Sequence, residues 1–273
     1  MTRPFDLAGA AAVITGGGSG IGRATALSFA RRGAKIVVGD LREERAKEVA
    51  AQIEAAGGAA IAVAADVSRE VDLEALRDSC LAAFGRVDVV MNNVGILAMG
   101  PPESLPDEAW QRVLEVNVMG IARSNRVFLP RLMDQGRGHV VNTASASGLL
   151  AYGFDRLPYV ASKHAIVGIT EALALYLAPK GIGVTCLCPS GVITNLMDDF
   201  ALYGQTSARP RAPKHAIVEA QDVGELVAEG VTAGRFLVTT APEIRDELIE
   251  RATDLDAYLQ ARITELEQSG AQR

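Results

Sequence analysis

Short runs of apolar and β-branched residues alternate with longer amphipathic runs from residue 10 to about residue 188. A parallel sheet whose strands are joined by helical crossovers produces this alternation. The predicted strands lie near 10–15, 35–39, 59–64, 87–91, 138–144 and 182–188, with a seventh at 235–240. The predicted helices lie at 20–32, 42–56, 69–84, 106–134 and 157–179. The sequence therefore predicts an α/β fold, a doubly wound sheet with helices on both faces.

Composition restricts the partners that the chain can have. Its 273 residues are 49% hydrophobic, and a chain of this length buries roughly three quarters of its unfolded surface, which predicts one domain over 1–273. A formal charge of -6, with 27 Lys and Arg residues spread along the chain, provides no basic patch for nucleic acid or an anionic membrane. The longest uncharged run, 181–197, contains Pro189 and Asn195, which predicts a strand and loop rather than a membrane span.

The cysteines and histidines bear on compartment and on metal binding. Cys186 and Cys188 lie two apart in an apolar run, which places both thiols on one buried face of a strand. Three cysteines are too few for a disulfide scaffold, and the first residues lack the apolar stretch of a signal peptide, so we expect a reduced, cytoplasmic protein. His139, His164 and His215 have no metal-ligand spacing, and no metal site is predicted.

A glycine-rich turn at 15–22, Thr-Gly-Gly-Gly-Ser-Gly-Ile-Gly, joins the first predicted strand to the first predicted helix. Glycines there let the backbone approach a pyrophosphate, whose charge the free N–H groups and the helix N-terminus stabilise. Taken alone, the turn is also consistent with a tight connection that binds nothing. Asp40 ends the second predicted strand about 20 residues later, where its carboxylate can accept hydrogen bonds from an adenosine ribose. The two features together predict a dinucleotide site.

The residues around Asp40 also bear on which dinucleotide is bound. A 2'-phosphate would place like charges against Asp40, which favours NAD(H) over NADP(H). Arg42 is a contrary signal, because a guanidinium two residues further on can swing toward a phosphate. It is equally consistent with a solvated charge in the first turn of the second helix. NADP(H) therefore stays possible.

Tyr159 and Lys163 lie four residues apart at the start of a predicted helix, a spacing that puts phenol and ammonium on the same face. A phenol with a pKa near 10 is a poor base at neutral pH, but a neighbouring cation favours the phenolate. The pair predicts that Tyr159 carries a proton, although ordinary surface helices also contain such pairs.

With this pair, the chain resembles the short-chain dehydrogenase/reductase family over residues 7 to about 195. The resemblance rests on several separated motifs. They are the 15–22 turn, Asp66-Val67, Asn92-Asn93-Val94-Gly95, Asn117, Ser145, the pair Tyr159 and Lys163, and 189–194. It implies a seven-stranded Rossmann-like fold with a catalytic tetrad of Asn117, Ser145, Tyr159 and Lys163.

The resemblance implies a role for each member of the tetrad. Ser145 would hydrogen-bond the substrate oxygen, with Ser147 as a nearby competitor. Lys163 would hold the nicotinamide ribose and lower the pKa of Tyr159. Asn117 would hold a water that links Lys163 to solvent; from its position inside a predicted helix alone, it is equally a cap or a helix irregularity.

The resemblance also implies cofactor contacts along the whole first two thirds of the chain. The implied residues are Gly16, Ser19, Gly20, Ile21, Gly22, Asp40, Asp66, Val67, Asn93, Gly95, Tyr159, Lys163, Pro189, Val192 and Thr194. In this assignment Asp66 meets the adenine amine, and Thr194 meets the nicotinamide carboxamide. The chain departs from the family pattern at Val94, where Ala is usual, and at Ser190, where Gly is common.

The predicted substrate pocket is apolar, which favours a hydrophobic or alicyclic substrate. Its predicted wall consists of Ile96, Leu97, Met99, Leu149, Phe154, Leu196 and Met197, with Arg156 as a possible carboxylate contact. The sequence predicts an NAD(H)-dependent oxidoreductase that interconverts a hydrophobic secondary alcohol and its ketone, with Tyr159 as acid and base. An NADPH-dependent ketone or 3-oxoacyl reductase is the alternative within this class. A non-catalytic NAD-binding regulator is the alternative from another class.

Two segments near the C-terminus are less regular. Residues 196–217 contain glycine and prolines and predict a substrate lid, or else a surface loop without a role. Residues 242–268 replace the family's common Asp-Gly-Gly and predict one long C-terminal helix with an apolar stripe. The stripe consists of Ile244, Leu248, Ile249, Ala252, Leu255, Leu259, Ile263 and Leu266. We expect it to pack on its own subunit, to extend a contact in a homodimer or homotetramer, or to brace the lid.

Overall fold

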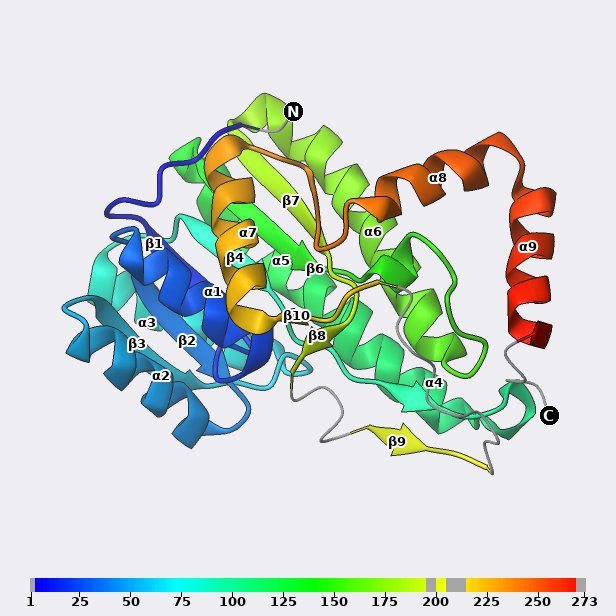
Figure 1. Cartoon of the computed structure of the whole chain (residues 1–273). Coiled ribbons are helices and arrows are strands. Elements are labelled where there is room, and N and C mark those ends of the chain that lie inside the picture. The colour runs from blue at the N-terminus through cyan, green and yellow to red at the C-terminus, as the bar shows by residue number, and fades with distance from the viewer. Residues whose placement is uncertain (1–2, 195–199, 205–214, 269–273) are drawn as a thin grey trace.

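The computed structural model describes residues 3–194, 200–204 and 215–268, which are built around a seven-stranded sheet (Figure 1). Its strands are β1 (Ala11–Thr15), β2 (Lys35–Asp40), β3 (Ala59–Ala64), β4 (Val89–Asn92), β6 (Gly138–Thr143), β7 (Ile182–Cys188) and β11 (Leu237–Thr239). Their order across the sheet is β11-β7-β6-β4-β1-β2-β3, and all neighbours are parallel. The strand order reverses between β1 and β4, as in a doubly wound fold, and the predicted fold class is confirmed.

Helices cover both faces of this sheet (Figure 1). One face carries α1 (Gly20–Arg31), α2 (Glu43–Ala55) and α7 (Ala220–Ala233). The other carries α3 (Glu70–Phe84), α5 (Gly120–Gln135) and α6 (Leu157–Leu177). The short elements are α4 (Asp107–Leu114), β5 (Ala98–Met99), β8 (Val192–Ile193), β9 (Ala201–Leu202), β10 (Val218–Glu219) and helical turns at Pro102–Ser104, Glu115–Met119, Ala146–Gly148 and Ala178–Lys180.

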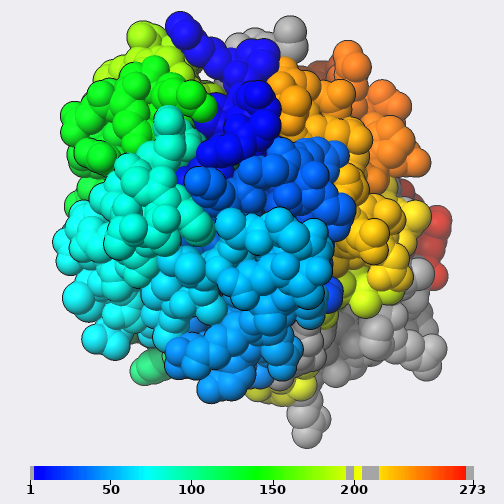
Figure 2. Space-filling view, turned by 90° about the vertical axis from the view of Figure 1, so that its left-hand side faces the viewer, coloured from blue at the N-terminus to red at the C-terminus, as the bar shows by residue number. Residues whose placement is uncertain are grey.

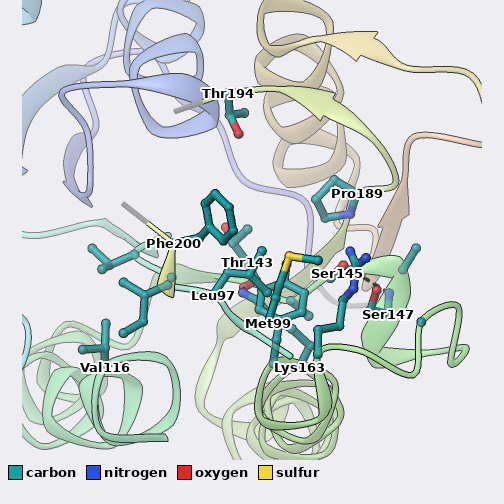
Figure 3. A pocket seen from close by; sticks show the side chains of 18 of the residues that line it. Leu97, Met99, Val116, Thr143, Ser145, Ser147, Lys163, Pro189, Thr194 and Phe200 are labelled. Carbon is teal, nitrogen blue, oxygen red and sulfur yellow. Dashed lines mark hydrogen bonds between the residues drawn. The ribbon is translucent and has the colours of Figure 1, made fainter. Parts of the chain in front are cut away.

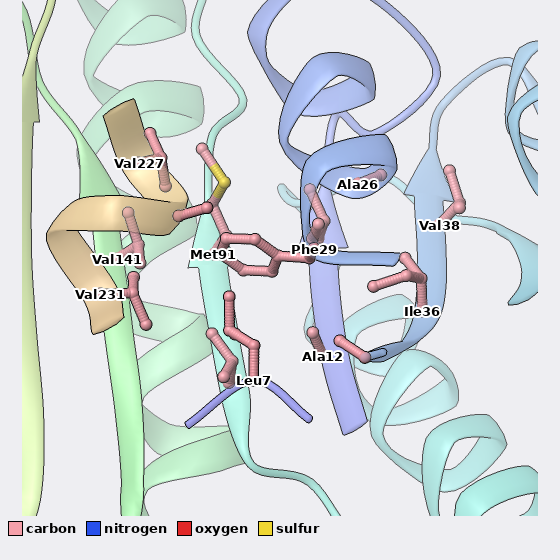
Figure 4. Close-up of a cluster of buried hydrophobic side chains, with 14 of the residues drawn as sticks. Leu7, Ala12, Ala26, Phe29, Ile36, Val38, Met91, Val141, Val227 and Val231 are labelled. Atoms are coloured by element: carbon pink, nitrogen blue, oxygen red, sulfur yellow. The ribbon is translucent and has the colours of Figure 1, made fainter. Parts of the chain in front are cut away.

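Each face of the sheet has its own apolar core. Phe29 of α1 packs with Val227 and Val231 of α7 over the strands on one face (Figure 4). Alternate residues of β1 enter opposite cores, Ile14 the first and Val13 the second. This is the reason that the strands of a sheet buried on both faces are continuously apolar in sequence.

The predicted strands and most predicted helices agree with the observed elements to within two residues, but α7 is not among the predicted helices. Val223, Val227 and Val231 recur every four residues and are buried, and this period is the signal that could have found it. Valine and glycine have low helix propensity, which obscures the pattern. At Gly224 a Cβ would lie 2.6 Å from the Ala24 backbone, so the close packing of α7 on α1 requires the glycine.

The predicted C-terminal helical segment is present, but it is divided into two helices rather than one. The segment forms α8 (Glu243–Thr253) and α9 (Leu255–Gln268), which Figure 1 shows at an angle to each other. Asp254 separates them with an extended backbone, φ -152 and ψ 99. Its carboxylate accepts a hydrogen bond from the Ala257 N–H at 2.9 Å. Asp254 therefore acts as an N-cap that starts a second helix.

The apolar stripe of this segment is not buried along its whole length. Ile244 is fully buried, but Leu255, Leu259 and Ile263 are 46%, 44% and 43% exposed. The stripe therefore packs on its own subunit at the start of α8, whereas these three stripe residues of α9 stay partly exposed. Figure 2 looks onto the β3 edge, where α1 to α3 fill the view and the C-terminal helices appear only at the margin. The subunit contact stays a prediction.

The predicted lid over 196–217, with Leu196 and Met197, lies mostly outside the described residues. Of the described part, β9 pairs in parallel with β5. Just beyond the segment, β10 pairs in parallel with β8. Since β5 follows β4 and β8 follows β7, both pairings lie beyond the carboxyl ends of the central strands.

One helix among the described residues, Leu157–Lys180, is long and apolar enough in length and composition to cross a membrane. It includes α6, which packs against β7 and the turn after β6. It also carries Lys163, whose buried ammonium donates to the Thr143 carbonyl at 2.8 Å. These contacts are typical of a helix that covers a sheet.

Candidate active site

A cleft of about 2190 Å³ opens at the carboxyl ends of the parallel strands. Pockets for one small ligand usually measure roughly 300–1,000 Å³, so this cleft has room for two ligands. It lies where the strand order reverses, which is the place where open α/β sheets bind ligands. The turn after β1 lines one end, residues of α6 line the middle, and residues of α9 line the other end.

The turn after β1 takes a path that only glycine permits. Gly16 and Gly20 have φ angles of +62° and +49°, in the left-handed region that glycine favours. A Cβ at Gly22 would lie 2.1 Å from the Gly16 carbonyl oxygen. Gly16, Ser19, Gly20 and Ile21 line the cleft, whereas Gly22 lies behind the turn. The turn thus forms a cradle of backbone at the N-terminus of α1, which fits a pyrophosphate.

Asp40 stands beside this cradle, at the end of β2. Its Oδ2 accepts the Gly18 N–H at 2.9 Å, and its Oδ1 accepts the Arg42 N–H at 3.0 Å. A Cβ at Gly18 would lie 2.8 Å from Asp40 Oδ2. The main chain therefore fixes a carboxylate on the cleft wall. Arg45 also lines this end, while Arg42 does not; Arg45 was not singled out from the sequence.

The ends of β3 and β4 complete the cofactor end of the cleft. Asp66 and Val67 line it, and Asp66 Oδ1 accepts both the N–H and the hydroxyl of Ser68 at 2.8 and 2.7 Å. Asn93 joins two loops, since its amide donates to the Gly16 carbonyl at 3.3 Å and accepts from Thr143 Oγ1 at 3.2 Å. These bonds hold the cleft walls at a fixed separation.

The segment after β7 forms the opposite wall, where Pro189, Val192 and Thr194 line the cleft. Ser190, which replaces the common glycine, is not in the left-handed region. Its N–H donates to Thr240 Oγ1 at 2.9 Å. The serine therefore fits this turn without backbone strain.

Ser145, Tyr159 and Lys163 converge in the middle of the cleft, from the end of β6 and the first turns of α6. Lys163 Nζ lies 5.5 Å from the centroid of the Tyr159 ring. The Ser145 hydroxyl oxygen accepts the Ser147 N–H at 3.1 Å, which orients it. Ser147 lines the cleft as well, and Figure 3 shows both serines and Pro189 on one side of the pocket.

Burial and nearby polar groups shift the pKa values of Lys163 and Tyr159. Burial lowers the pKa of Lys163 to about 8. Burial also raises the pKa of Tyr159, while the Ser145 hydroxyl and the Arg156 guanidinium act in the opposite direction. The tyrosine is thus a neutral acid at pH 7 in this state, and additional positive charge or hydrogen bonding is needed to make it a base.

Asn117 does not line the cleft but supports it from behind. It lies in the π-helical turn Glu115–Met119 between α4 and α5, so the predicted helix irregularity is correct. Its side chain accepts the Ile96 N–H at 2.8 Å and donates to the Ile96 carbonyl and to Ser162 Oγ at 3.1 and 3.0 Å. A Cβ at Gly95 would lie 3.3 Å from Lys163 Nζ and 3.7 Å from Asn117 Oδ1. The glycine gives the Lys163 ammonium room, whereas the distance to Asn117 is an ordinary contact. The water proposed for Asn117 stays a prediction.

Several residues of the predicted apolar wall line the substrate end, together with the ion pair of Arg156 and Asp155. Leu97 and Phe154 line the cleft with Ile96 and Met99 (Figure 3 labels Leu97 and Met99). Leu149 does not line it, because its side chain packs into two buried clusters. The lining residues that sequence reasoning missed include Tyr152, Phe200, His215, Leu259, Ile263 and Leu266. The sequence showed the three residues of α9 only as members of an apolar stripe, with nothing to indicate that they line the cleft.

The comparisons with known proteins show the family to which the chain belongs. Residues 10–202 match the family described as short chain dehydrogenase. The chain is 39% identical over 191 residues to cyclohexanol dehydrogenase of Acinetobacter sp. (strain SE19), covering 69% of this chain and 75% of the relative. It is 36% identical over 248 residues to 1-deoxy-11-beta-hydroxypentalenate dehydrogenase of Streptomyces exfoliatus, covering 90% and 88%.

A solved structure is similar over nearly the whole chain. It is a short chain dehydrogenase/reductase from Burkholderia phymatum in complex with NAD, with a TM-score of 0.82, 36% identity and coverage of 93% of this chain and 96% of that one. The chain belongs to the short-chain dehydrogenase/reductase family. It is an oxidoreductase of the NAD(P)-dependent kind.

Proposed function

We propose that this protein interconverts a hydrophobic secondary alcohol and its ketone with NAD(H). The observation that carries the proposal is the convergence of Ser145, Tyr159 and Lys163 in one cleft with Asp40 at its other end. The backbone cradle, the carboxylate fixed by two N–H groups and the glycine at position 95 fit a nicotinamide dinucleotide. Bound there, the dinucleotide supplies the acceptor or donor of the hydride.

Tyr159 moves the proton in this proposal. During oxidation its oxygen takes the hydroxyl proton of the alcohol, and during reduction it returns that proton to the ketone oxygen. Ser145 donates its hydroxyl proton to the same substrate oxygen as negative charge develops. Ser145 Oγ accepts the Ser147 N–H, and its hydroxyl also hydrogen-bonds Tyr159 and lowers the pKa of that phenol, so the serine stands beside the group that moves the proton.

Lys163 and Asn117 support Tyr159 rather than react. The Lys163 ammonium, held by the Thr143 carbonyl, favours the phenolate form of the neighbouring tyrosine. Asn117 positions Ile96 and Ser162, and the Ser162 hydroxyl donates to the Tyr159 carbonyl at 2.7 Å. These bonds fix the first turn of α6, so the phenol and ammonium keep their relative orientation.

The preference for NAD(H) rests on Asp40. Asp40 is 9% exposed, and two backbone N–H groups already orient its carboxylate, so it accepts ribose hydroxyls without reorganising. A 2'-phosphate there would meet a fixed negative charge. Arg45 lies on the same wall, and its guanidinium is the group that would attract the 2'-phosphate of NADP(H). Comparing turnover with the two cofactors therefore shows which of the two charges dominates.

The apolar lining supports a hydrophobic substrate, and so do the relatives, which are dehydrogenases named for cyclohexanol and for a hydroxypentalenate. The test is the absorbance at 340 nm with a panel of cyclic and acyclic secondary alcohols and their ketones, each with NAD(H) and NADP(H). We expect turnover of hydrophobic members with NAD(H). Turnover with NADP(H) alone would favour the 3-oxoacyl or ketone reductase alternative, and NADH binding without any turnover would favour a regulator.

A further inference from the structure

The cleft continues past the catalytic residues as far as α9. Leu259, Ile263 and Leu266 line it from this helix, and their spacing of four and three residues places them on one helical face. The match to the family ends at residue 202, so this wall lies in a part of the chain that the family match does not cover.

The apolar residues of α9 differ in whether they line the cleft, not in how exposed they are. Leu255 and Leu259 lie on the same stripe and have similar exposure, 46% and 44%. Only Leu259, together with Ile263 one turn later, faces the cleft. Large apolar side chains are thus left uncovered by their own chain inside a cavity that contains Ser145, where an apolar ligand would cover them.

The position of α9 is fixed relative to the catalytic serine. Tyr258 of α9 and Ile244 of α8 are buried in one cluster with Ala146 and Leu150. Ala146 is the residue after Ser145, and Leu150 follows in the same segment. Because the helices pack on the segment that carries the catalytic serine, α9 forms a wall of the same site rather than a separate appendage.

A buried polar group completes this attachment. Glu247 of α8 lies with Oε1 2.8 Å from His215 Nε2, and the Tyr152 hydroxyl donates to its Oε2 at 3.3 Å. The Tyr152 and His215 rings meet edge to face with centroids 5.5 Å apart. Both rings also line the cleft. Glu247 therefore ties α8 to two residues of the cleft wall.

The charged residues that α9 presents to the cleft pair with each other, so they do not indicate a charged substrate. Arg262 lines the cleft but pairs with Glu265, one turn further on, which also lines it. The guanidinium and the carboxylate neutralise each other along this wall. The remaining surface that α9 presents is apolar.

We infer that α9 is the distal wall of the substrate subsite, where Leu259 and Ile263 contact the apolar body of a bulky secondary alcohol. This inference rests on the proposed function, which places the carbinol group at Ser145 and Tyr159. A single small ring at those residues is expected to leave α9 uncontacted. A polycyclic or long-chain alcohol covers it.

The experiment compares cyclohexanol with a 3-hydroxysteroid in Leu259→Ala, Ile263→Ala and the matched control Leu255→Ala. Removing side-chain carbons from an apolar contact costs about one order of magnitude in binding. We expect the KM for the steroid to rise about tenfold in the first two variants, with the KM for cyclohexanol and for NAD changed less than about twofold. The control is expected to match the wild type for both alcohols.

Calorimetric binding of the steroid to the NADH-loaded protein separates this inference from the proposed function. If no alcohol is turned over, the proposed reaction fails, yet weaker steroid binding in Leu259→Ala and Ile263→Ala alone still supports the subsite. Equal effects on both alcohols, an equal effect of Leu255→Ala, or no steroid binding to the wild type would overturn it. A change in light-scattering mass without a change in KM or affinity would also overturn it, and would assign the face to a subunit contact.

Discussion

The two ends of the cleft are built in different ways. At the cofactor end, main-chain bonds at strand ends fix the polar groups, as with Asp40 between two N–H groups. At the distal end, side chains of α9 face the cavity. Tyr258 anchors this helix in one apolar cluster, and the buried carboxylate of Glu247 holds the preceding helix, α8. The first construction tolerates little change, because strands and turns hold its geometry. The second can vary without disturbing the sheet.

This difference predicts a division of labour. A change at the cofactor end or among the catalytic residues is expected to affect every substrate. A change on α9 is expected to affect only substrates large enough to reach it. Variants at both ends, measured with the same substrates, can break or sharpen this comparison.

The largest expected effect is at the reacting tyrosine. Tyr159→Phe deletes one hydroxyl at the proton-transfer step and leaves the cradle for the dinucleotide unchanged, so turnover should fall at least about a hundredfold while NADH binding stays within about twofold. Steady-state rates and NADH fluorescence titration measure the two quantities. Retention of a tenth or more of the turnover would contradict the role of Tyr159.

A smaller effect is expected at the ribose contact. Asp40→Ala removes a fixed carboxylate from a wall that keeps Arg45, so the preference for NAD over NADP should shift by about 1–3 kcal/mol. The ratio of kcat/KM for the two cofactors measures it. Glu44→Ala, an exposed carboxylate four residues away, is the control for net charge. If both variants leave the ratio unchanged, Asp40 does not contact the ribose.

Lys163 should show a conflict between stability and function. Since burial lowers the pKa of Lys163 to about 8 from the ordinary 10.5, its ammonium destabilises the fold by about 3 kcal/mol below pH 8, and this effect disappears as the pH rises toward 10.5. Lys163→Met should raise the unfolding free energy by about 1–3 kcal/mol near pH 7 and by less near pH 9.5, because the lost bond to Thr143 offsets part of the gain. Turnover should fall.

Urea denaturation at the two pH values tests this pattern. An equal loss of stability at both pH values would mean that burial of the ammonium costs the fold little. The result also bears on the comparison of the two ends of the cleft, because it shows whether the Lys163 ammonium is buried there at a cost in stability.

The smallest effect is expected where α8 is attached to the cleft wall. Glu247→Gln removes the charge of a buried carboxylate that contacts His215 and Tyr152, which should cost about 1–2 kcal/mol of stability. The KM for a bulky alcohol should rise about two- to fivefold, because α9 loses part of its support. Glu250→Gln, exposed on the same helix, is the control. Identical melting temperatures for both variants would show that the pair does not hold α8.

The residues assigned to the cofactor end of the cleft could be predicted from the sequence because their signals are local. A glycine turn, a carboxylate after a strand and a tyrosine four residues before a lysine each restrict the backbone or the chemistry within a few positions. The strand pattern then brings these residues to one edge of the sheet. The structure places Ser145, Tyr159 and Lys163 in one cleft, as this reasoning requires.

The distal end was not predictable in the same way. The apolar period of 242–268 continues across Asp254, so periodicity alone does not show that this aspartate caps a second helix. Leu255 and Leu259 have the same place in that period, and only tertiary packing decides which one faces the cleft. His215 pairs with Glu247, 32 residues later, a contact that no short motif indicates.

The division of labour between the two ends is tested most directly by one ratio, kcat/KM for a 3-hydroxysteroid over kcat/KM for cyclohexanol, measured in the wild type, Ser145→Ala and Ile263→Ala. Ser145 meets an oxygen that both alcohols have, so its loss should lower both values about a hundredfold and leave the ratio within about twofold of the wild type. Ile263→Ala should lower the ratio about tenfold through the steroid alone. An unchanged ratio in Ile263→Ala, or an equal shift in both variants, would contradict the account.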